Sequence, residues 1–186
     1  QALASGTEEA LRAYRERYRD SVLISGDSEL RAYLRAREVG KVYAYRDFTA
    51  AYPRSRLADE FIPRIEEFER WVERLEFGDD PMRAIRHLGE MGDETAVPLL
   101  VGKLSVAALE GEARSAIIRI GEPAVRTLME VLISPLQSVE LKDKVAGLIA
   151  EMGGITSVPA LRSYVAKEET AAGRRALLAL EEKVAR

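Results

Sequence analysis

The amino-acid sequence predicts an all-α protein, built as an α-α superhelix (a solenoid) of consecutive helical hairpins. Two observations lead to this prediction. Residues 6–57 repeat with a period of 34, and the segment from residue 79 onward repeats around glycines that are 29 and 32 residues apart. Periods of this length are typical of chains that stack helix pairs. We therefore expect two regions, 1–78 and 79–186, with different packing rules.

Composition excludes several classes of function. The 186 residues are 47% hydrophobic and 32% charged, which suits a folded chain with a sizeable core. The net charge of −3 argues against binding nucleic acid through its phosphates. There is no cysteine and one histidine, His87, so thiolate chemistry, cysteine metal sites and sites with two imidazoles are excluded. No apolar run approaches the roughly 18 residues of a membrane span.

The aromatic residues divide the chain unevenly. Of the 7 tyrosines, 4 phenylalanines and 1 tryptophan, all except Tyr164 lie between Tyr14 and Phe77. We therefore expect rings to fill the core of the first region, and Leu, Ile, Val and Met to fill the core of the second.

In the first region, a shift of 34 residues superposes Ala10, Tyr14 and Tyr18 on Ala44, Phe48 and Tyr52. A spacing of four places each trio on one stripe of a helix. Several features predict where the helices begin and end. A helix begins at Asp27 or Ser28, Gly40 takes a left-handed conformation, Tyr52-Pro53 ends a helix, Ser55 caps the next, and that helix runs to Phe77 with a bend at Pro63 and closes on Gly78.

The sequence Ala44-Tyr45-Arg46-Asp47-Phe48, followed by Tyr52-Pro53-Arg54-Ser55, resembles the tetratricopeptide (TPR) repeat over about residues 6–70. The variant is similar to repeats of bacterial envelope lipoproteins and assembly factors. A bacterial origin also fits the excess of Arg over Lys, which is typical of GC-rich genomes. The start at Gln1 rather than Met is compatible with removal of a signal or anchor segment or with an arbitrary boundary. The resemblance favours the bacterial periplasm or envelope over the cytoplasm, and the compartment stays open.

The second region begins at Asp80-Pro81, a helix start with a capping carboxylate and a proline in the first turn. Three first-helix stripes then end in a glycine: Ala84-Leu88-Met91-Gly92, Ala113-Ile117-Ile120-Gly121 and Val145-Ile149-Met152-Gly153. Each is followed by a second-helix stripe: Val97-Leu100-Leu104, Val125-Leu128-Leu132 and Val158-Leu161-Val165. Residues 174–182 restart a first helix and are expected to cap the stack.

This pattern resembles the short HEAT-like repeats first noted in phycobilin lyases, over about residues 80–165. In such stacks the second helices line the concave surface. The resemblance therefore implies a contact set formed by the polar positions of those helices: Lys103, Arg126, Glu130, Arg162 and Ser163.

The candidate chemical groups have simpler structural explanations. We interpret His87 as a structural histidine and Trp71 as a core residue in a stripe with Phe68 and Leu75. Asp93 and Glu122 follow the glycines at the start of second helices, where carboxylates complement the helix dipole. The helical methionines are expected in the core: Met91, Met129 and Met152. No catalytic residue, metal or cofactor is predicted.

The sequence therefore predicts a non-enzymatic protein–protein interaction or scaffold module with a protein or peptide partner. Two alternatives stay open. One is an accessory subunit or lyase-like protein that acts on a cofactor or chromophore, and the other is a structural spacer in a cell-envelope complex. The oligomeric state, and whether the two repeat arrays form one continuous superhelix, are also open.

Overall fold

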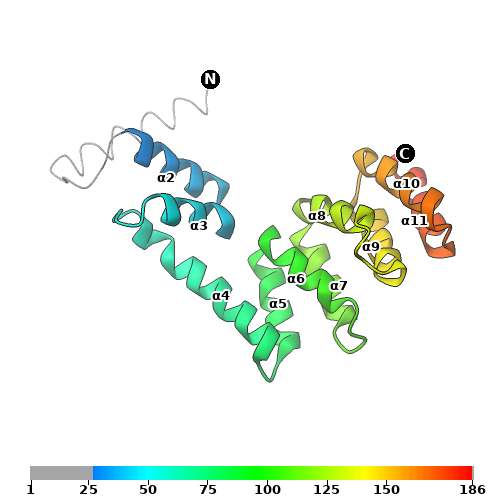
Figure 1. Ribbon diagram of the computed structural model, residues 1–186, viewed down its shortest axis with the longest axis horizontal. Helices are drawn as coiled ribbons and strands as arrows, with labels where there is room; N and C mark the ends of the chain where they lie inside the picture. The colour runs from blue at the N-terminus through cyan, green and yellow to red at the C-terminus, as the bar shows by residue number, and fades with distance from the viewer. Residues whose placement is uncertain (1–26, 186) are drawn as a thin grey trace. The chain divides into compact units, whose positions relative to one another are not determined.

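A computed structural model of the protein describes residues 27–185, and it contains helices and no strand over that range (Figure 1). The chain divides into two compact units, Gln1–Glu69 and Arg70–Arg186, so that one helix, α4, contributes to both. Each unit is described by itself. The first helix of the first copy of the 34-residue repeat, with Ala10, Tyr14 and Tyr18, lies outside the described residues, and its partner helix begins at Asp27 as predicted.

The described part of the first unit is a helical hairpin followed by a short turn and the start of a longer helix. Its elements are α2 (Asp27–Val39), α3 (Val42–Ala51), the 3-10 turn η1 (Ala58–Glu60) and α4 (Ile62–Phe77). Gly40 joins α2 to α3 with a φ of +67°, which confirms the predicted left-handed residue. Helix α3 ends before Tyr52-Pro53, also as predicted.

Aromatic rings make the core of this unit. Phe61 stacks on Tyr45 with ring centroids 4.4 Å apart and on Tyr33 at 5.3 Å, and it meets Phe48 edge-on at 5.5 Å. The side chains of Tyr33, Phe48 and Phe61 are buried. Ala44 and Phe48 therefore face the core on one stripe of α3, as their spacing predicts.

The single long helix predicted from Ser55 to Phe77, with a bend at Pro63, is wrong. The Ser55 hydroxyl accepts from Leu57 N at 3.1 Å and caps the η1 turn, and α4 begins only at Ile62. Pro63 lies in the first turn of α4, where its missing N–H would have had no partner within the helix. It therefore starts the helix instead of bending it.

The second unit contains the second half of α4 and the repeats. Their elements are α5 (Pro81–Met91), η2 (Glu94–Ala96), α6 (Val97–Lys103), α7 (Glu110–Ile120), α8 (Glu122–Ile133), α9 (Val139–Met152), η3 (Ile155–Ser157), α10 (Val158–Glu168) and α11 (Ala171–Val184).

These helices stack in two rows. In the first-helix row, α5 packs against α7, α7 against α9, and α9 against α11; in the second-helix row, α6 packs against α8 and α8 against α10. The alternation confirms an all-α solenoid of HEAT-like hairpins. The capping helix α11 completes the first-helix row and begins earlier than predicted, because the Thr170 hydroxyl accepts from Gly173 N.

The predicted stripes form the core of the second unit. Ala84, Leu88, Ile117, Val145 and Ile149 of the first helices are fully buried. The second-helix stripes are buried too, except that Val158 and Val165 are half-buried. Aliphatic side chains therefore fill the core of the repeats, and Tyr164 is the one aromatic residue among these described repeats.

The three turn glycines are used differently. Gly92 is left-handed, with φ 62° and ψ 24°, and Gly121 also has a positive φ of 80°. Gly153 has an ordinary φ of −70°, so conformational freedom does not explain it. A Cβ at Gly153 would lie 2.6 Å from the carbonyl oxygen of Ile149 and 2.8 Å from the Ser157 hydroxyl, so close approach requires the glycine there.

Candidate functional site

The charged side chains of the first-helix row tie neighbouring repeats together. Arg86 of α5 donates to Glu112 of α7 at 3.2 Å, which raises the pKa of Arg86. Arg114 of α7 pairs with Glu151 of α9. Lys183 of α11 donates to the carbonyl oxygen of Glu151 at 2.7 Å. These polar groups are therefore engaged within the fold.

Lys144 connects three elements of the stack. Its ammonium group donates to the carbonyl oxygen of Leu104, at the end of α6, and to the Glu110 carboxylate of α7, both at 2.9 Å. The bond to Glu110 raises the pKa of Lys144. This side chain also satisfies a carbonyl at a helix end, which would otherwise lack a partner.

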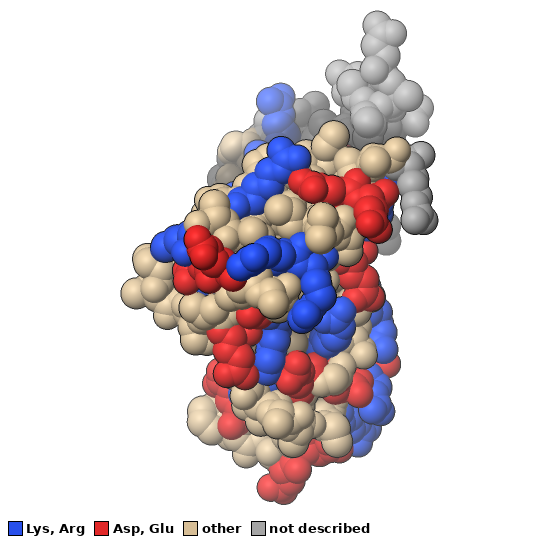
Figure 2. Space-filling model, turned by 90° about the vertical axis from the view of Figure 1, so that its right-hand side faces the viewer, with Lys and Arg blue, Asp and Glu red and all other residues tan. Residues whose placement is uncertain are grey.

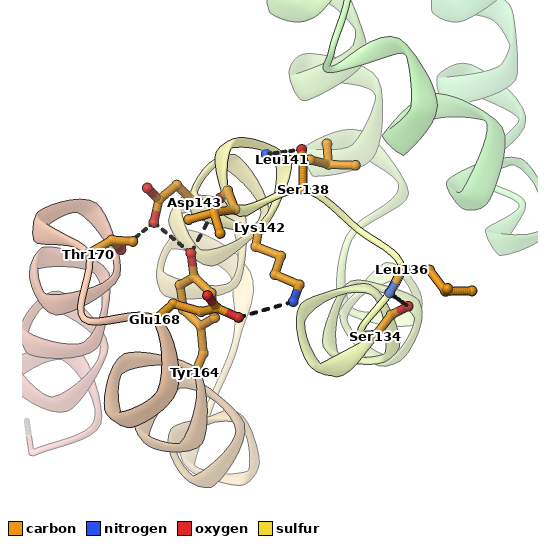
Figure 3. A network of polar contacts seen from close by, with 10 residues as sticks. Ser134, Leu136, Ser138, Leu141, Lys142, Asp143, Tyr164, Glu168 and Thr170 are labelled. Carbon is orange, nitrogen blue, oxygen red and sulfur yellow. Dashed lines mark hydrogen bonds and ion pairs between the residues drawn. The ribbon is translucent and has the colours of Figure 1, made fainter.

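A second polar network holds the last hairpin (Figure 3). The Tyr164 hydroxyl donates to Asp143 at 2.8 Å, and the Thr170 hydroxyl donates to the same carboxylate oxygen at 2.5 Å. Burial, together with the bond to Asp143, raises the pKa of Tyr164 to about 12. Lys142, whose side chain is buried, points toward Glu168 with 3.5 Å between its nitrogen and the carboxylate oxygen. The network joins α9, α10 and the start of α11, which is a structural role.

The five residues predicted as a contact set lie on the second-helix row, but not all of them are available. Arg162 of α10 pairs with Glu181 of α11 at 2.7 Å. Arg126 and Glu130 pair within α8 at 3.4 Å, and their side chains are 88% and 63% exposed. Ser163 is exposed and Lys103 is half-buried. The set is therefore spread along three helices and is not brought together in one cavity.

The charges of the described residues are mixed on the surface. Figure 2 shows Lys and Arg side chains interleaved with Asp and Glu side chains over the described part of one face. Such a face offers separate contacts of either sign rather than one continuous basic area.

His87 and Trp71 form a stacked pair in the second unit. Their ring centroids lie 4.0 Å apart with an interplanar angle of 17°, and the guanidinium of Arg74 lies 4.8 Å over the Trp71 ring. His87 also contacts Glu90, with 3.4 Å between Nδ1 and the carboxylate oxygen. The structural interpretation of His87 agrees with this packing. Trp71 is only half-buried, so the prediction that it lies in the core is wrong for this member of the stripe, although Leu75 is buried.

The carboxylates after the turn glycines behave differently from each other. Asp93 is buried and accepts from Thr95 N at 2.9 Å, which confirms its capping role, although it caps the η2 turn and not α6 itself. Glu122 lies exposed in the first turn of α8 and makes no capping bond there. The three predicted core methionines are half-buried: Met91, Met129 and Met152.

The sequence did not predict a groove that lies between α2 and α3. This cavity has a volume of about 390 Å³. Its lining residues are Ala32, Arg35, Ala36, Val39, Tyr43, Ala44, Asp47, Phe48, Ala51 and Tyr52. Alanines at a spacing of four on α2 were the available signal, because they leave room between helices that larger side chains would fill.

Exposed apolar side chains gather at the connection between α8 and α9. Ile133 is 62% exposed, Leu136 is 90% exposed and Val139 is 42% exposed. The Leu136 backbone N–H donates to the Ser134 hydroxyl at 3.3 Å, which shapes the turn (Figure 3). These three exposed residues lie close together in the sequence, between the end of α8 and the start of α9.

Among residues 27–185 there is no group of three or more His, Cys, Asp or Glu side chains that could hold a metal ion. None of the described helices has the length and apolar character that crossing a membrane requires.

Comparison with known proteins identifies one of the repeats. Residues 81–105, which contain α5, η2 and α6, match the family model described as PBS lyase HEAT-like repeat. No curated protein and no solved structure gives a significant match to the chain. This match, together with the two rows of stacked helices, supports a HEAT-like repeat architecture for the second unit.

Proposed function

We propose that the protein is a non-enzymatic interaction or scaffold module, and that a protein partner binds the exposed side chains of its second-helix row. One observation supports this most directly. The ion pairs of Arg86 and Arg114 join helices of the first row, whereas Arg126 and Glu130 pair only within α8 and remain largely exposed. The second-helix row therefore keeps charged groups that the stacking of repeats does not use.

A protein or peptide fits this surface better than a nucleic acid does. The row carries both signs of charge, with Lys103 on α6 and both Arg126 and Glu130 on α8. A duplex would need many phosphate contacts from a concentrated positive surface, and the chain has a net charge of −3. Exposed ion pairs at the rim of an interface contribute to partner choice and association rate more than to affinity.

Site-specific photo-crosslinking tests this proposal. A photoreactive amino acid replaces Arg126 or Ser163 on the second-helix row, and Arg119, an exposed residue of α7, serves as the matched control on the first-helix row. We expect a discrete crosslinked protein from bacterial lysate at positions 126 and 163 and none at 119. Mass spectrometry identifies the species, and purified partner then reproduces the crosslink.

Two outcomes would contradict the proposal. Equal crosslinking at all three positions would show that capture does not depend on the second-helix row. Turnover in a panel of lyase and hydrolase assays, or a coloured ligand that copurifies with the protein, would instead favour action on a cofactor or chromophore.

A further inference from the structure

The groove between α2 and α3 carries two opposite charges that the fold does not neutralise. Arg35 of α2 and Asp47 of α3 both line the cavity, and neither has an ion pair or hydrogen bond to another described residue. Two other arginines of the same unit are paired: Arg37 with Glu60 at 3.6 Å, and Arg46 with Glu69 at 3.0 Å. The two unpaired charges therefore stand on opposite walls of one cavity.

Alanines and aromatic rings make up most of the remaining lining. Ala32 and Ala36 of α2 and Ala44 of α3 line the space, with the buried ring of Phe48 among them. Alanine extends only one carbon from the backbone, so a chain that enters the groove can approach both helices closely. Tyr43, at 44% exposure, adds an aromatic wall that can pack on an apolar side chain.

The groove suits a peptide better than an enclosed small molecule. Its volume of about 390 Å³ is within the range of about 300–1,000 Å³ that is common for ligand sites. However, Arg35, Tyr43, Asp47 and Ala51 are all exposed, so a small ligand would remain in contact with water. A peptide is longer than the cavity and needs no such enclosure.

We propose that this groove binds a peptide segment of a protein partner in which an acidic residue and a basic residue flank a small apolar residue. The acidic side chain pairs with the Arg35 guanidinium, for which a carboxylate is the matching acceptor. The basic side chain pairs with the Asp47 carboxylate. The apolar residue contacts the alanines. This site belongs to the first unit and does not depend on the role proposed for the second-helix row.

Peptide selection on the full chain tests the proposal. A random peptide library displayed on phage is panned on the purified protein, and an enriched peptide is then measured by fluorescence polarisation. We expect enriched sequences to contain the acidic, small apolar and basic pattern. Arg35→Glu and Asp47→Arg should each weaken binding roughly five-fold, as expected for exposed ion pairs. The double variant should prefer a peptide in which the two charges are exchanged.

Two further variants keep the test decisive. Ala51→Trp fills the groove at an exposed position and should abolish binding, while its helical circular dichroism reports folding. Glu38→Arg changes charge at an exposed position of α2 outside the cavity and should leave affinity within two-fold.

Three results would overturn the proposal. The first is the absence of any enriched peptide. The second is equal binding by the Arg35 and Asp47 variants and the Glu38→Arg control. The third is self-association that Ala51→Trp removes in sedimentation velocity, because a second copy of the chain would then occupy the groove.

Discussion

The two units solve the same packing problem with different side chains. In the first unit, Phe61 gathers the rings of Tyr33, Tyr45 and Phe48 into one cluster. In the second unit, buried aliphatic side chains fill successive hairpins. Large rings fill the interior from few positions, so small residues elsewhere on the hairpin can leave a groove.

The polar contacts follow the same division. Each unit contains a buried tyrosine that donates to a carboxylate: Tyr33 to Glu60 and Tyr164 to Asp143. Beyond that common feature, the repeats add ion pairs from one first helix to the next, such as Arg86 with Glu112. Each repeat of a solenoid contacts only the neighbouring repeats, so the stability of the array depends on every interface between them. The first unit therefore depends on one cluster of rings, whereas the second unit depends on many similar interfaces between helices.

The largest change in stability is expected from a substitution in the aromatic cluster of the first unit. Phe61→Ala removes three ring contacts and leaves a cavity, so we expect the free energy of unfolding to fall by about 4 kcal/mol. Denaturant unfolding followed by circular dichroism measures the loss. Ile62→Ala, at a neighbouring position that is 41% exposed, should cost less than about 1 kcal/mol. Equal losses for the two variants would show that the ring cluster is not the core of the first unit.

The next largest change in stability is expected where two repeats pack closely. A Cβ at Gly89 would lie 2.7 Å from the Cβ of Ala116, so Gly89→Ala should push α5 away from α7 and cost about 2 kcal/mol. Gly102 is the matched control, because it also lies in a helix but has open space where a Cβ would be. Gly102→Ala should raise stability by up to about 1 kcal/mol, because alanine is the better helix former. Thermal unfolding of both variants gives the sign of each change in stability. A stabilised Gly89→Ala variant would contradict the close approach of α5 to α7.

A smaller effect is expected on the pH dependence of stability, to which the two buried tyrosines contribute. Because the pKa of Tyr164 is raised from 10.0 to about 12, the folded state keeps a proton that the unfolded state releases. The contribution of the Tyr164 hydroxyl to the free energy of unfolding is full below pH 10 and is lost as the pH rises toward 12. Tyr164→Phe should lower stability by about 1 kcal/mol at pH 8 and make the alkaline loss less steep.

Tyr33 gives the counterpart in the first unit, since burial and Glu60 also raise its pKa to about 12. Tyr33→Phe should therefore change the alkaline slope in the same direction. Tyr43→Phe, at an exposed position, is the control and should change stability at pH 8 by less than about 0.5 kcal/mol. Urea unfolding at pH 8 and pH 11 measures all three variants. An unaltered slope in Tyr164→Phe would show that this hydroxyl does not carry the effect.

The smallest effect concerns a position at which the hairpins differ. Ser157 is fully buried and its hydroxyl has no hydrogen-bond partner, whereas alanine precedes the matching valine in the other two hairpins, at Ala96 and Ala124. Ser157→Ala should raise stability by about 0.5–1 kcal/mol, because it removes an unsatisfied polar group. Ser163→Ala, on the exposed surface, should change stability by less than about 0.5 kcal/mol. Differential scanning calorimetry measures the stability of both variants. A loss of stability in the Ser157→Ala variant would show that the Ser157 hydroxyl has a hydrogen-bond partner.

Helical periodicity predicted much of this fold. The spacing of Ala84, Leu88 and Ile117 identified buried positions, because a helix presents every third or fourth residue to its neighbour. Asp80 and Asp93 were found for a similar reason, since a capping carboxylate acts on backbone N–H groups two or three residues away. Such local rules need no knowledge of the distant chain.

The candidate sites were predicted less well. Arg162 was assigned to a binding surface, but it pairs with Glu181, which lies 19 residues further along the chain. The groove with Arg35 and Asp47 was missed, because alanines spaced along one helix do not show whether side chains of another helix fill the space. Both depend on contacts between helices, and a helical stripe gives the face of one helix but not the partner of each side chain.

By itself, the sequence determined the class of the fold, the order of the hairpins in the second unit and the two kinds of core, because hydrophobic periodicity, caps and breakers act within a few residues. Only the tertiary structure decided which charges are used between repeats, that Gly153 is a packing glycine rather than a left-handed one, and that α2 and α3 leave a groove. The physical reason is range. Local rules fix backbone direction over one or two turns, whereas ion pairs, close approaches and cavities form between helices that are distant in sequence.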